Sequence, residues 1–339
     1  MNSSKPWFSL RKSEDVPREA DLVPGALNPA TWQRIEDLVA MQRHAPALSP
    51  KQVGSARARL AGSHLSRFRG RGMDYQESRA YQAGDDVRHM DWRVTARTGT
   101  AQIKLYQEER ERPVLLFLDL HPGMFFGTRG LLKSAAAARA GALIAWAAVE
   151  RGDRVGAVLT NGARCELPPR GGRQGALQFI RHVVAHTDPR TAIDAANSPA
   201  SLNDGLARLC RVSRPGSQIF LLGDFAGIDD ESDHLIHRLH RHCDVAALQI
   251  VDPLELSPPP PARYGIAIGA ERGVLDLRSR AARRAYQAHF DRHHRAVDDL
   301  MRRHGVPLAR LSTDQDLAQQ VRRILVGGVA HAIVERLAA

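Results

Sequence analysis

Short, uninterrupted apolar segments alternate with longer amphipathic or alanine-rich segments between residues 113 and 326. Uninterrupted apolar runs are typical of strands buried on both faces, and apolar positions every three to four residues predict helices. We expect strands at residues 114–118, 154–160, 218–222, 245–251 and 308–311. We expect helices at residues 131–150, 175–186, 201–212, 230–242, 279–304 and 314–326. This alternation predicts an α/β fold with a doubly wound, mainly parallel sheet and helices on both faces.

The strands supply the predicted core. Because both faces of such a sheet are covered, successive side chains of one strand should all be buried. The residues that we expect to be buried are Leu116, Leu118, Val155, Val158, Phe220, Leu222, Ala247 and Ile250.

The rest of the chain divides into three segments. Residues 1–53 are expected to form an N-terminal arm with a short helix that starts near Asn28 and Pro29, residue types suited to a helix start. Residues 54–112 are rich in glycine and arginine, then polar and aromatic, with too few aliphatic side chains for a core. We expect them to pack on the sheet domain, residues 113–326, which is followed by a C-terminal tail at residues 327–339.

Composition bears on location more than on fold. The longest nearly uncharged apolar run, residues 134–149, is mostly alanine, which favours a buried helix over a membrane span. The N-terminus has no apolar segment of the kind found in signal peptides. Cys165, Cys210 and Cys243 lie far apart, which argues against a disulfide scaffold or a zinc site. We therefore expect a cytoplasmic protein without membrane insertion.

The net charge of +11 raises the alternative of nucleic-acid binding. Residues 51–71 contain basic side chains but no acidic one, and a second basic stretch, residues 278–303, is diluted by aspartates. Neither stretch is accompanied by a recognition-helix, zinc-finger or aromatic RNA-binding motif. Nucleic-acid binding is therefore kept as a secondary alternative.

A long, irregular motif lies between residues 72 and 97. Its core is Gly84-Asp85-Asp86-x-Arg88-x-x-Asp91-Trp92, with Tyr81 before it and Arg97 after it. The motif resembles the signature of a bacterial family catalogued as domain of unknown function 58, and the resemblance extends to about residue 310. That family resembles von Willebrand factor A domains, and its members often accompany AAA+ ATPases of the MoxR type. The resemblance implies a chaperone-like adaptor or assembly protein that acts with such an ATPase and with other protein clients.

The von Willebrand A resemblance also implies a place for a divalent cation. In that fold a D-x-S-x-S loop, a threonine and a later aspartate hold the ion, because Mg²⁺ prefers oxygen ligands. In this sequence Asp119 begins the loop, but His121 and Gly123 replace the two serines. Ser201 and Asp224 are the remaining candidates. We expect a degenerate metal site and no bound cofactor. Two alternatives stay open: the site could still bind Mg²⁺, or the aspartates could cap loop amides.

No catalytic set is evident elsewhere. Residues 127–134 resemble a phosphate-binding loop, but Leu132 stands where the second glycine of a Walker A motif is required. His234, His237 and His240 point in different directions around a helix, and His289 and His293 are expected at the surface. We therefore expect a protein that is not an enzyme, with a metal- or nucleotide-dependent hydrolase as the alternative.

The motif residues are also the best candidates for an interaction site. Aspartates alternate with arginines between residues 85 and 97, and Trp92 and Tyr81 belong to the residue types enriched at interaction hot spots. The same residues could instead form an internal ion-pair network, and the sequence leaves both interpretations open. Arg170 and Arg173, in a segment expected to be an exposed loop, form a second candidate.

Overall fold

The structure is a computed structural model, and it divides the chain into two compact units. One unit comprises residues 1–50 and 112–339, and the other comprises residues 51–111. The residues that the structure describes are 33–48, 73–82, 86–108, 113–161, 163–189, 201–268 and 271–327. The expected helix start at Asn28 and nearly all of the expected C-terminal tail therefore lie outside the described residues.

The larger unit is built on a six-stranded sheet in the order β10-β7-β6-β3-β4-β5. Five of its strands run parallel, and β5 pairs antiparallel with β4 at one edge. The strand bounds are β3 Pro113–Asp119, β4 Arg154–Asn161, β5 Ala163–Arg170, β6 Gln218–Gly223, β7 Asp244–Val251 and β10 Leu308–Ser312. The predicted fold class, a doubly wound and mainly parallel sheet, is confirmed.

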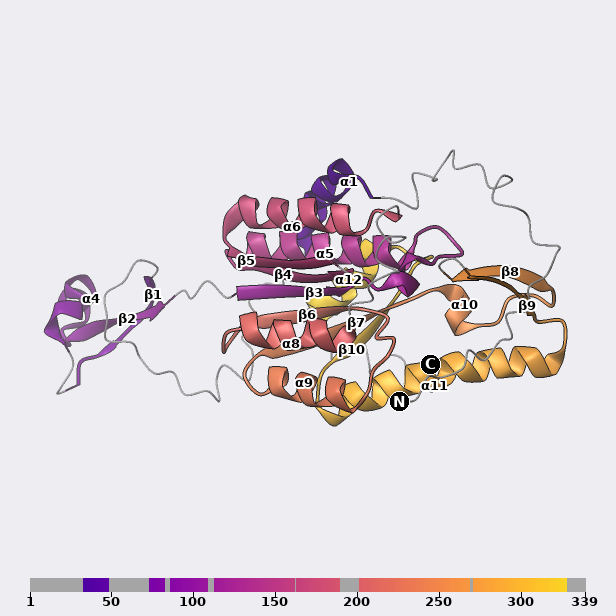
Figure 1. The fold of residues 1–339 in the computed structure, drawn as a ribbon. Coiled ribbons are helices and arrows are strands. Elements are labelled where there is room, and N and C mark those ends of the chain that lie inside the picture. Colours follow the sequence, from indigo (N-terminus) through magenta and orange to yellow (C-terminus); the bar gives the residue numbers. More distant parts are fainter. Residues whose placement is uncertain are drawn as a thin grey trace. The chain divides into compact units, whose positions relative to one another are not determined.

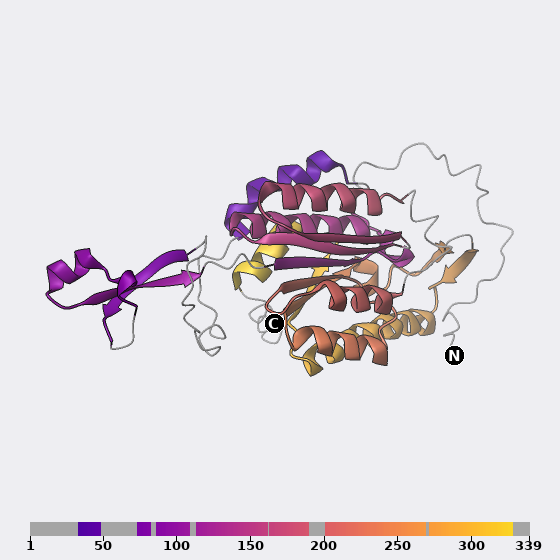
Figure 2. The same ribbon diagram turned by 60° about the vertical axis from the view of Figure 1, so that its left-hand side comes forward.

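Helices cover both faces of this sheet (Figure 1), and a second view shows the same layers (Figure 2). One face carries α1 Ile35–Ala40, η2 Met41–His44, α2 Ala45–Leu48, α5 Lys133–Glu150, α6 Gly172–His186 and α12 Leu317–Gly327. The other carries α8 Leu202–Val212, α9 Asp230–His240 and α11 Arg280–Arg303. Shorter elements are η4 Pro122–Phe125, α10 Pro253–Leu256 and the hairpin β8 Arg263–Ile268 with β9 Glu271–Asp276. Within the described ranges, no helix has the length and apolarity needed to cross a bilayer.

The central strand shows how the two cores are separated. Leu116 and Leu118 of β3 contribute to the core under α5, whereas Leu115 and Phe117 contribute to the core under α8 and α9. All eight residues predicted to be buried are buried. Trp146 of α5 is fully buried, and its indole nitrogen donates to the Leu38 carbonyl oxygen at 3.0 Å. The N-terminal helices are therefore part of the sheet domain's packing.

Strand β5 and the β8–β9 hairpin were not predicted. Proline is tolerated in a sheet at an edge strand, so Pro168 and Pro169 do not prevent β5 from pairing along one side. The loop expected around Arg170 and Arg173 is wrong, because Arg170 ends β5 and Arg173 lies in the first turn of α6. Both arginines are exposed, as expected.

Gly205 allows α8 to lie close to the sheet. A Cβ atom there would come within 2.7 Å of Phe117 Cε2 and of Thr160 Cγ2. We expect Gly205→Ala to lower the free energy of unfolding by about 1–3 kcal/mol in urea denaturation, because a crowded core must shift to accept an added methyl group. Gly265→Ala is the control, since nothing lies within 4 Å of its Cβ position. Equal effects of the two substitutions would contradict this close packing.

In the part of the smaller unit that the structure describes, residues 73–82 and 86–108, there are one hairpin and two short helices. Strand β1 Met73–Ala80 pairs antiparallel with β2 Gln102–Glu108, and η3 Val87–His89 and α4 Trp92–Thr98 lie between them in sequence. Among its residues of described burial, Ile103 and Asp91 are the buried ones. That residues 54–112 pack on the sheet domain stays a prediction.

Candidate functional site at the carboxyl ends of β3 and β6

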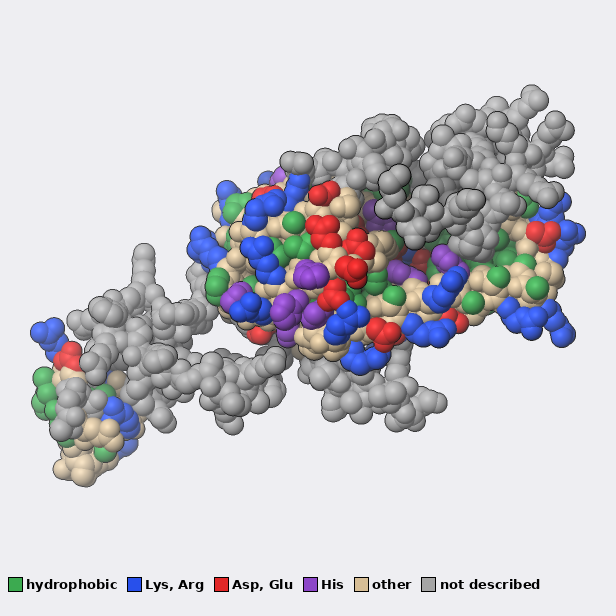
Figure 3. All heavy atoms as spheres, turned by 60° about the horizontal axis from the view of Figure 1, so that its bottom comes forward, with side chains coloured by type: hydrophobic (Ala, Val, Ile, Leu, Met, Phe, Trp, Pro, Cys, Tyr) green, Lys and Arg blue, Asp and Glu red, His purple; other side chains and the backbone are tan. Residues whose placement is uncertain are grey.

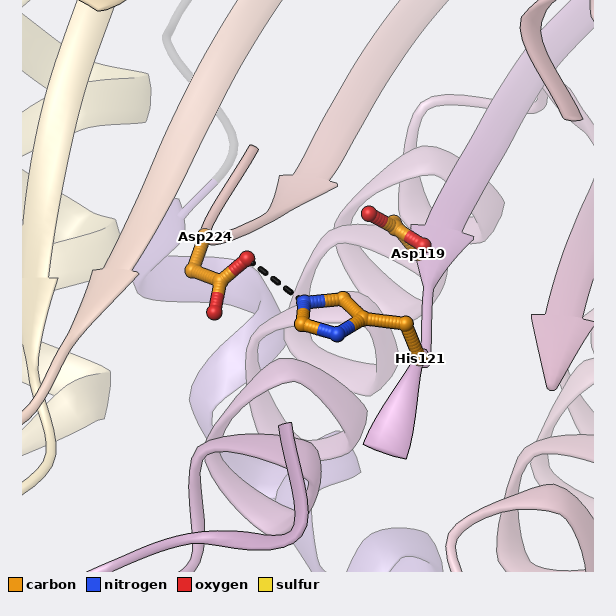
Figure 4. A group of neighbouring side chains, drawn as sticks. All are labelled: Asp119, His121 and Asp224. Carbon is orange, nitrogen blue, oxygen red and sulfur yellow. Dashed lines mark hydrogen bonds and ion pairs between the residues drawn. The ribbon is translucent and has the colours of Figure 1, made fainter. Parts of the chain in front are cut away.

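Two aspartates meet where neighbouring parallel strands end. Asp119 is the last residue of β3, and Asp224 directly follows β6, the strand paired with β3. His121 follows Asp119 by two residues and points toward Asp224 (Figure 4). One ligand-type atom from each of these three residues lies within 4.8 Å of the others. The carboxyl ends of parallel strands are the usual place for ligands in such sheets, so this cluster is the candidate site.

His121 connects its loop to the second aspartate. Its Nε2 atom lies 2.8 Å from Asp224 Oδ1, and its Nδ1 atom accepts a hydrogen bond from the Gly123 amide at 3.1 Å. In the neutral ring, an accepting Nδ1 leaves the proton on Nε2, which then donates to Asp224. A Cβ atom on Gly123 would lie 2.6 Å from His121 Cε1, so glycine makes room for the ring. His121 and Gly123 replace the expected serines. The His121 ring packs against the backbone of Gly123 and accepts a hydrogen bond from its amide.

Lys133 supplies a buried positive charge to this cluster. The side chain is only 3% exposed, and its Nζ atom donates to Asp224 Oδ2 and to Glu255 Oε1, each at 2.6 Å. Glu255 belongs to α10 and also accepts from the Asp252 amide at 3.0 Å. Asp252 in turn accepts from the amide and the hydroxyl of Thr128. The ammonium therefore joins the ends of β6 and β7 to the start of α5.

The two aspartates differ in their affinity for protons. Burial alone would raise the pKa of Asp224, but the Lys133 charge and the His121 hydrogen bond hold it well below its usual range. Burial raises the pKa of Asp119 to about 6, against the opposing influence of His121 and with a further contribution from Asp224. Asp119 is 1% exposed, and its Oδ2 atom is buried with no hydrogen-bond partner among the described residues. Asp119 is thus the incompletely satisfied carboxylate.

Of the predicted metal candidates, the structure brings together Asp119 and Asp224. Ser201 is exposed and caps α8, where its hydroxyl accepts from the Asp204 amide at 3.1 Å. Thr160 contacts Asp119 instead, because its hydroxyl lies 3.3 Å from Asp119 Oδ1. Sequence reasoning did not identify Thr160, Lys133 or Glu255 as neighbours of these aspartates.

The contacts of the remaining candidate sites, the phosphate-binding loop and the histidines, show what these residues do in the fold. The resemblance of residues 127–134 to a phosphate-binding loop does not extend to its lysine, because Lys133 is buried in ion pairs. His289 and His293 are both partly exposed, and His293 Nε2 lies 2.8 Å from the Asp224 carbonyl oxygen. His234 Nδ1 lies 2.6 Å from the Asp230 carbonyl oxygen of its own helix. Within the described ranges, Asp119, His121 and Asp224 are the one group with metal-ligand proximity.

The family motif in the smaller unit is mostly exposed. The Asp91 carboxylate caps α4 by accepting a hydrogen bond from the Val94 amide at 3.1 Å. It also accepts one from the Ser78 hydroxyl at 2.9 Å. The Asp86 carboxylate accepts from the Arg88 amide at 2.9 Å and caps η3. The exposed motif residues are Tyr81, Asp86, Arg88, Trp92 and Arg97, while Gly84 and Asp85 lie outside the described residues. Asp86 and Asp91 therefore act as helix caps.

The surface around α9 and α11 carries mixed charge. Histidine, basic and acidic side chains lie near one another on this face (Figure 3). Several arginines of the second basic stretch are paired with acids, as in Arg278–Asp276, Arg302–Asp299 and Arg303–Asp233. This mixture differs from the continuous basic surface that binds nucleic acid. The first basic stretch, residues 51–71, lies outside the described residues.

Comparisons with known proteins place this fold and motif in a family. The chain is 34% identical over 271 residues to uncharacterized proteins of Mycobacterium tuberculosis and Mycobacterium bovis, a match that covers 78% of this chain and 82% of each relative. It is also similar to the solved conserved hypothetical protein BatB from Bacteroides thetaiotaomicron, with a TM-score of 0.40, 13% identity and coverage of 65% of this chain and 98% of BatB. A von Willebrand factor type A structure from Catenulispora acidiphila gives a TM-score of 0.35, 12% identity and coverage of 67% and 44%. The profile described as "Protein of unknown function DUF58" matches residues 77–296, and the chain belongs to that family.

Proposed function

We propose that this protein is a non-enzymatic adaptor whose smaller unit, residues 51–111, docks onto a partner protein. The observation that carries the proposal is the exposure of Trp92. Its side chain is 70% exposed at the first position of α4, although tryptophan is usually largely buried within a folded chain. Tryptophan and arginine are enriched among the residues that dominate binding energy at interfaces.

The contacts of the neighbouring residues favour a docking surface over an internal ion-pair network. Asp86 and Asp91 are used as helix caps, and neither forms an ion pair with another described residue. Arg88 is exposed, and no ion pair involves its guanidinium among the described residues. Val87 is also exposed, at 57%. The apolar and cationic side chains of this segment are thus available to a partner.

The cluster of Asp119, His121 and Asp224 at the carboxyl ends of β3 and β6 supports the proposal that the protein is not an enzyme. A general acid or base must reach the reacting group of a substrate within hydrogen-bonding distance. Both oxygens of Asp224 are already engaged, by His121 and by Lys133, and Lys133 is held between two carboxylates. Such a cluster fits a structural role better than hydrolysis.

The proposed partner is an AAA+ ATPase of the MoxR type, which the family motif implies. The test is affinity capture of purified MoxR-type ATPase from the same organism by the full chain, with and without ATP. We expect Trp92→Ala to weaken capture by about 30-fold or more, the size of effect typical of an interface hot spot. The free energy of unfolding should change by less than about 0.5 kcal/mol, as for other exposed positions.

Phe126→Ala is the matched control, because Phe126 is an aromatic residue of the larger unit that is 44% exposed. It should leave capture unchanged. If Trp92→Ala lowers stability instead of capture, the segment is internal and the docking proposal is wrong. If the folded wild-type chain captures no ATPase under either nucleotide condition, the proposed partner is wrong.

A further inference from the structure

The carboxylate charges at the carboxyl ends of β3, β6 and β7 are balanced by a positive charge of the same chain. Three carboxylates, those of Asp119, Asp224 and Glu255, are largely buried near one another at the ends of β3, β6 and β7. Buried carboxylates require a compensating positive charge, because the protein interior solvates anions poorly. The Lys133 ammonium meets this requirement for two of them, at 2.6 Å from each.

The same cluster has the ligand types of a divalent-cation site. Asp119, His121 and Asp224 bring two carboxylates and an imidazole within 4.8 Å of one another, a combination that suits Mn²⁺ or Zn²⁺. A second observation points to a ligand there, since the buried Asp119 Oδ2 atom has no partner among the described residues. In the wild-type chain, however, Asp224 already pairs with Lys133, and a divalent ion bound to Asp224 would lie close to that ammonium.

We propose that Lys133 is the resident cation of this site. Its ammonium pairs with Asp224, one of the two carboxylates that would otherwise bind a divalent metal ion. It thereby makes the fold at the carboxyl ends of these strands independent of metal. Without that charge, Asp119, His121 and Asp224 become the ligands of a Mn²⁺ or Zn²⁺ ion. This proposal is independent of the docking role of residues 51–111.

The proposal predicts that metal binding appears when the ammonium is removed. Wild-type protein, Lys133→Ala and Lys133→Gln are stripped with a chelator, and their thermal unfolding is followed at pH 7.5 with Mn²⁺, Zn²⁺ or Mg²⁺. Wild type should show no change in melting temperature with any of these ions. Either variant should gain about 5 °C or more with Mn²⁺ or Zn²⁺ at a hundred times the dissociation constant.

Two controls identify the ligands. Lys104→Ala removes a lysine of the smaller unit and should remain insensitive to metal. Lys133→Ala combined with Asp119→Asn should lose the gain, because the amide replaces a carboxylate ligand. Isothermal titration calorimetry of Lys133→Ala should give one bound Mn²⁺ or Zn²⁺ ion per chain.

Several outcomes would overturn the proposal. One is a wild-type chain that binds these ions as tightly as Lys133→Ala, because Lys133 would then not replace the metal. Another is a folded Lys133→Ala that gains no stability from Mn²⁺ or Zn²⁺. If both Lys133 variants are unfolded without metal, the proposal requires that Mn²⁺ or Zn²⁺ restores their native circular dichroism. Failure of that rescue also counts against it.

Discussion

Asp224→Ala is expected to lower the free energy of unfolding by about 3–5 kcal/mol, because it removes one of the two carboxylates that compensate the buried Lys133 charge. The substitution leaves Lys133 with Glu255 as its one carboxylate partner and deprives His121 Nε2 of its acceptor. Urea denaturation followed by tryptophan fluorescence measures the loss, since Trp146 is fully buried in the same unit.

The contribution of the ion pair itself requires a double-mutant cycle. Lys133→Met and Asp224→Asn should each destabilise strongly, whereas the double variant should lose less than the sum by about 0.5–3 kcal/mol. Asp299→Ala is the matched control, because Asp299 forms a salt bridge with Arg302 that is largely exposed to solvent. That substitution should leave stability nearly unchanged. Additive effects of Lys133 and Asp224 would contradict a direct pairing of the two side chains.

Strands β3, β4, β6 and β7 were predictable because each is buried on both faces and therefore appears as a nearly continuous apolar run. Strand β5 lacks such a run, since its sequence contains Pro168 and Pro169 and one of its edges is unpaired. The alternation of buried Cys165 and Leu167 with exposed Glu166 and Pro168 is too short to identify the strand from sequence. Its existence follows from the pairing of its residues with β4, which sequence alone does not reveal.

The two aspartates of the site were predictable for the same reason, since each directly follows or ends a buried run. Lys133 was recognised in the sequence only as a lysine in a defective phosphate-binding loop. A signal for its real role was present, because Lys133 and Arg139 are the charged residues in the apolar stretch from 131 to 149. A lysine in a buried helix needs carboxylate partners. Glu255, however, lies 122 residues further on, and no spacing rule connects them.

The role of the motif in the smaller unit could be predicted from sequence only in part. Asp91 precedes a helical segment and is a residue type suited to a helix N-cap, so its structural role could have been inferred. The exposure of Trp92 could not, because the fraction of a side chain in contact with solvent depends on the three-dimensional packing of the whole unit.

Asp119→Asn is expected to stabilise the protein by about 2–3 kcal/mol at pH 8, since a pKa difference of one unit corresponds to about 1.4 kcal/mol. Burial raises the pKa of Asp119 from 3.8 to about 6, so the folded state holds this proton more tightly than the unfolded state does. The wild-type carboxylate therefore costs stability above pH 6, and that cost disappears as the pH falls from about 6 to about 4. Asparagine carries no charge at any of these pH values.

The measurement is the difference in unfolding free energy between Asp119→Asn and wild type from pH 4 to pH 8, and the control variant below is followed down to about pH 2. Taking the difference cancels the titration of other groups, such as His294, whose pKa is lowered by burial to about 4. Asp276→Asn serves as the control of opposite sign, because hydrogen bonds from Arg278 lower the pKa of Asp276 to about 2. That variant should be less stable than wild type at neutral pH, and its deficit should shrink as the pH falls below about 4. A difference for Asp119→Asn that stays constant across the range would mean that this buried carboxyl group does not titrate near pH 6.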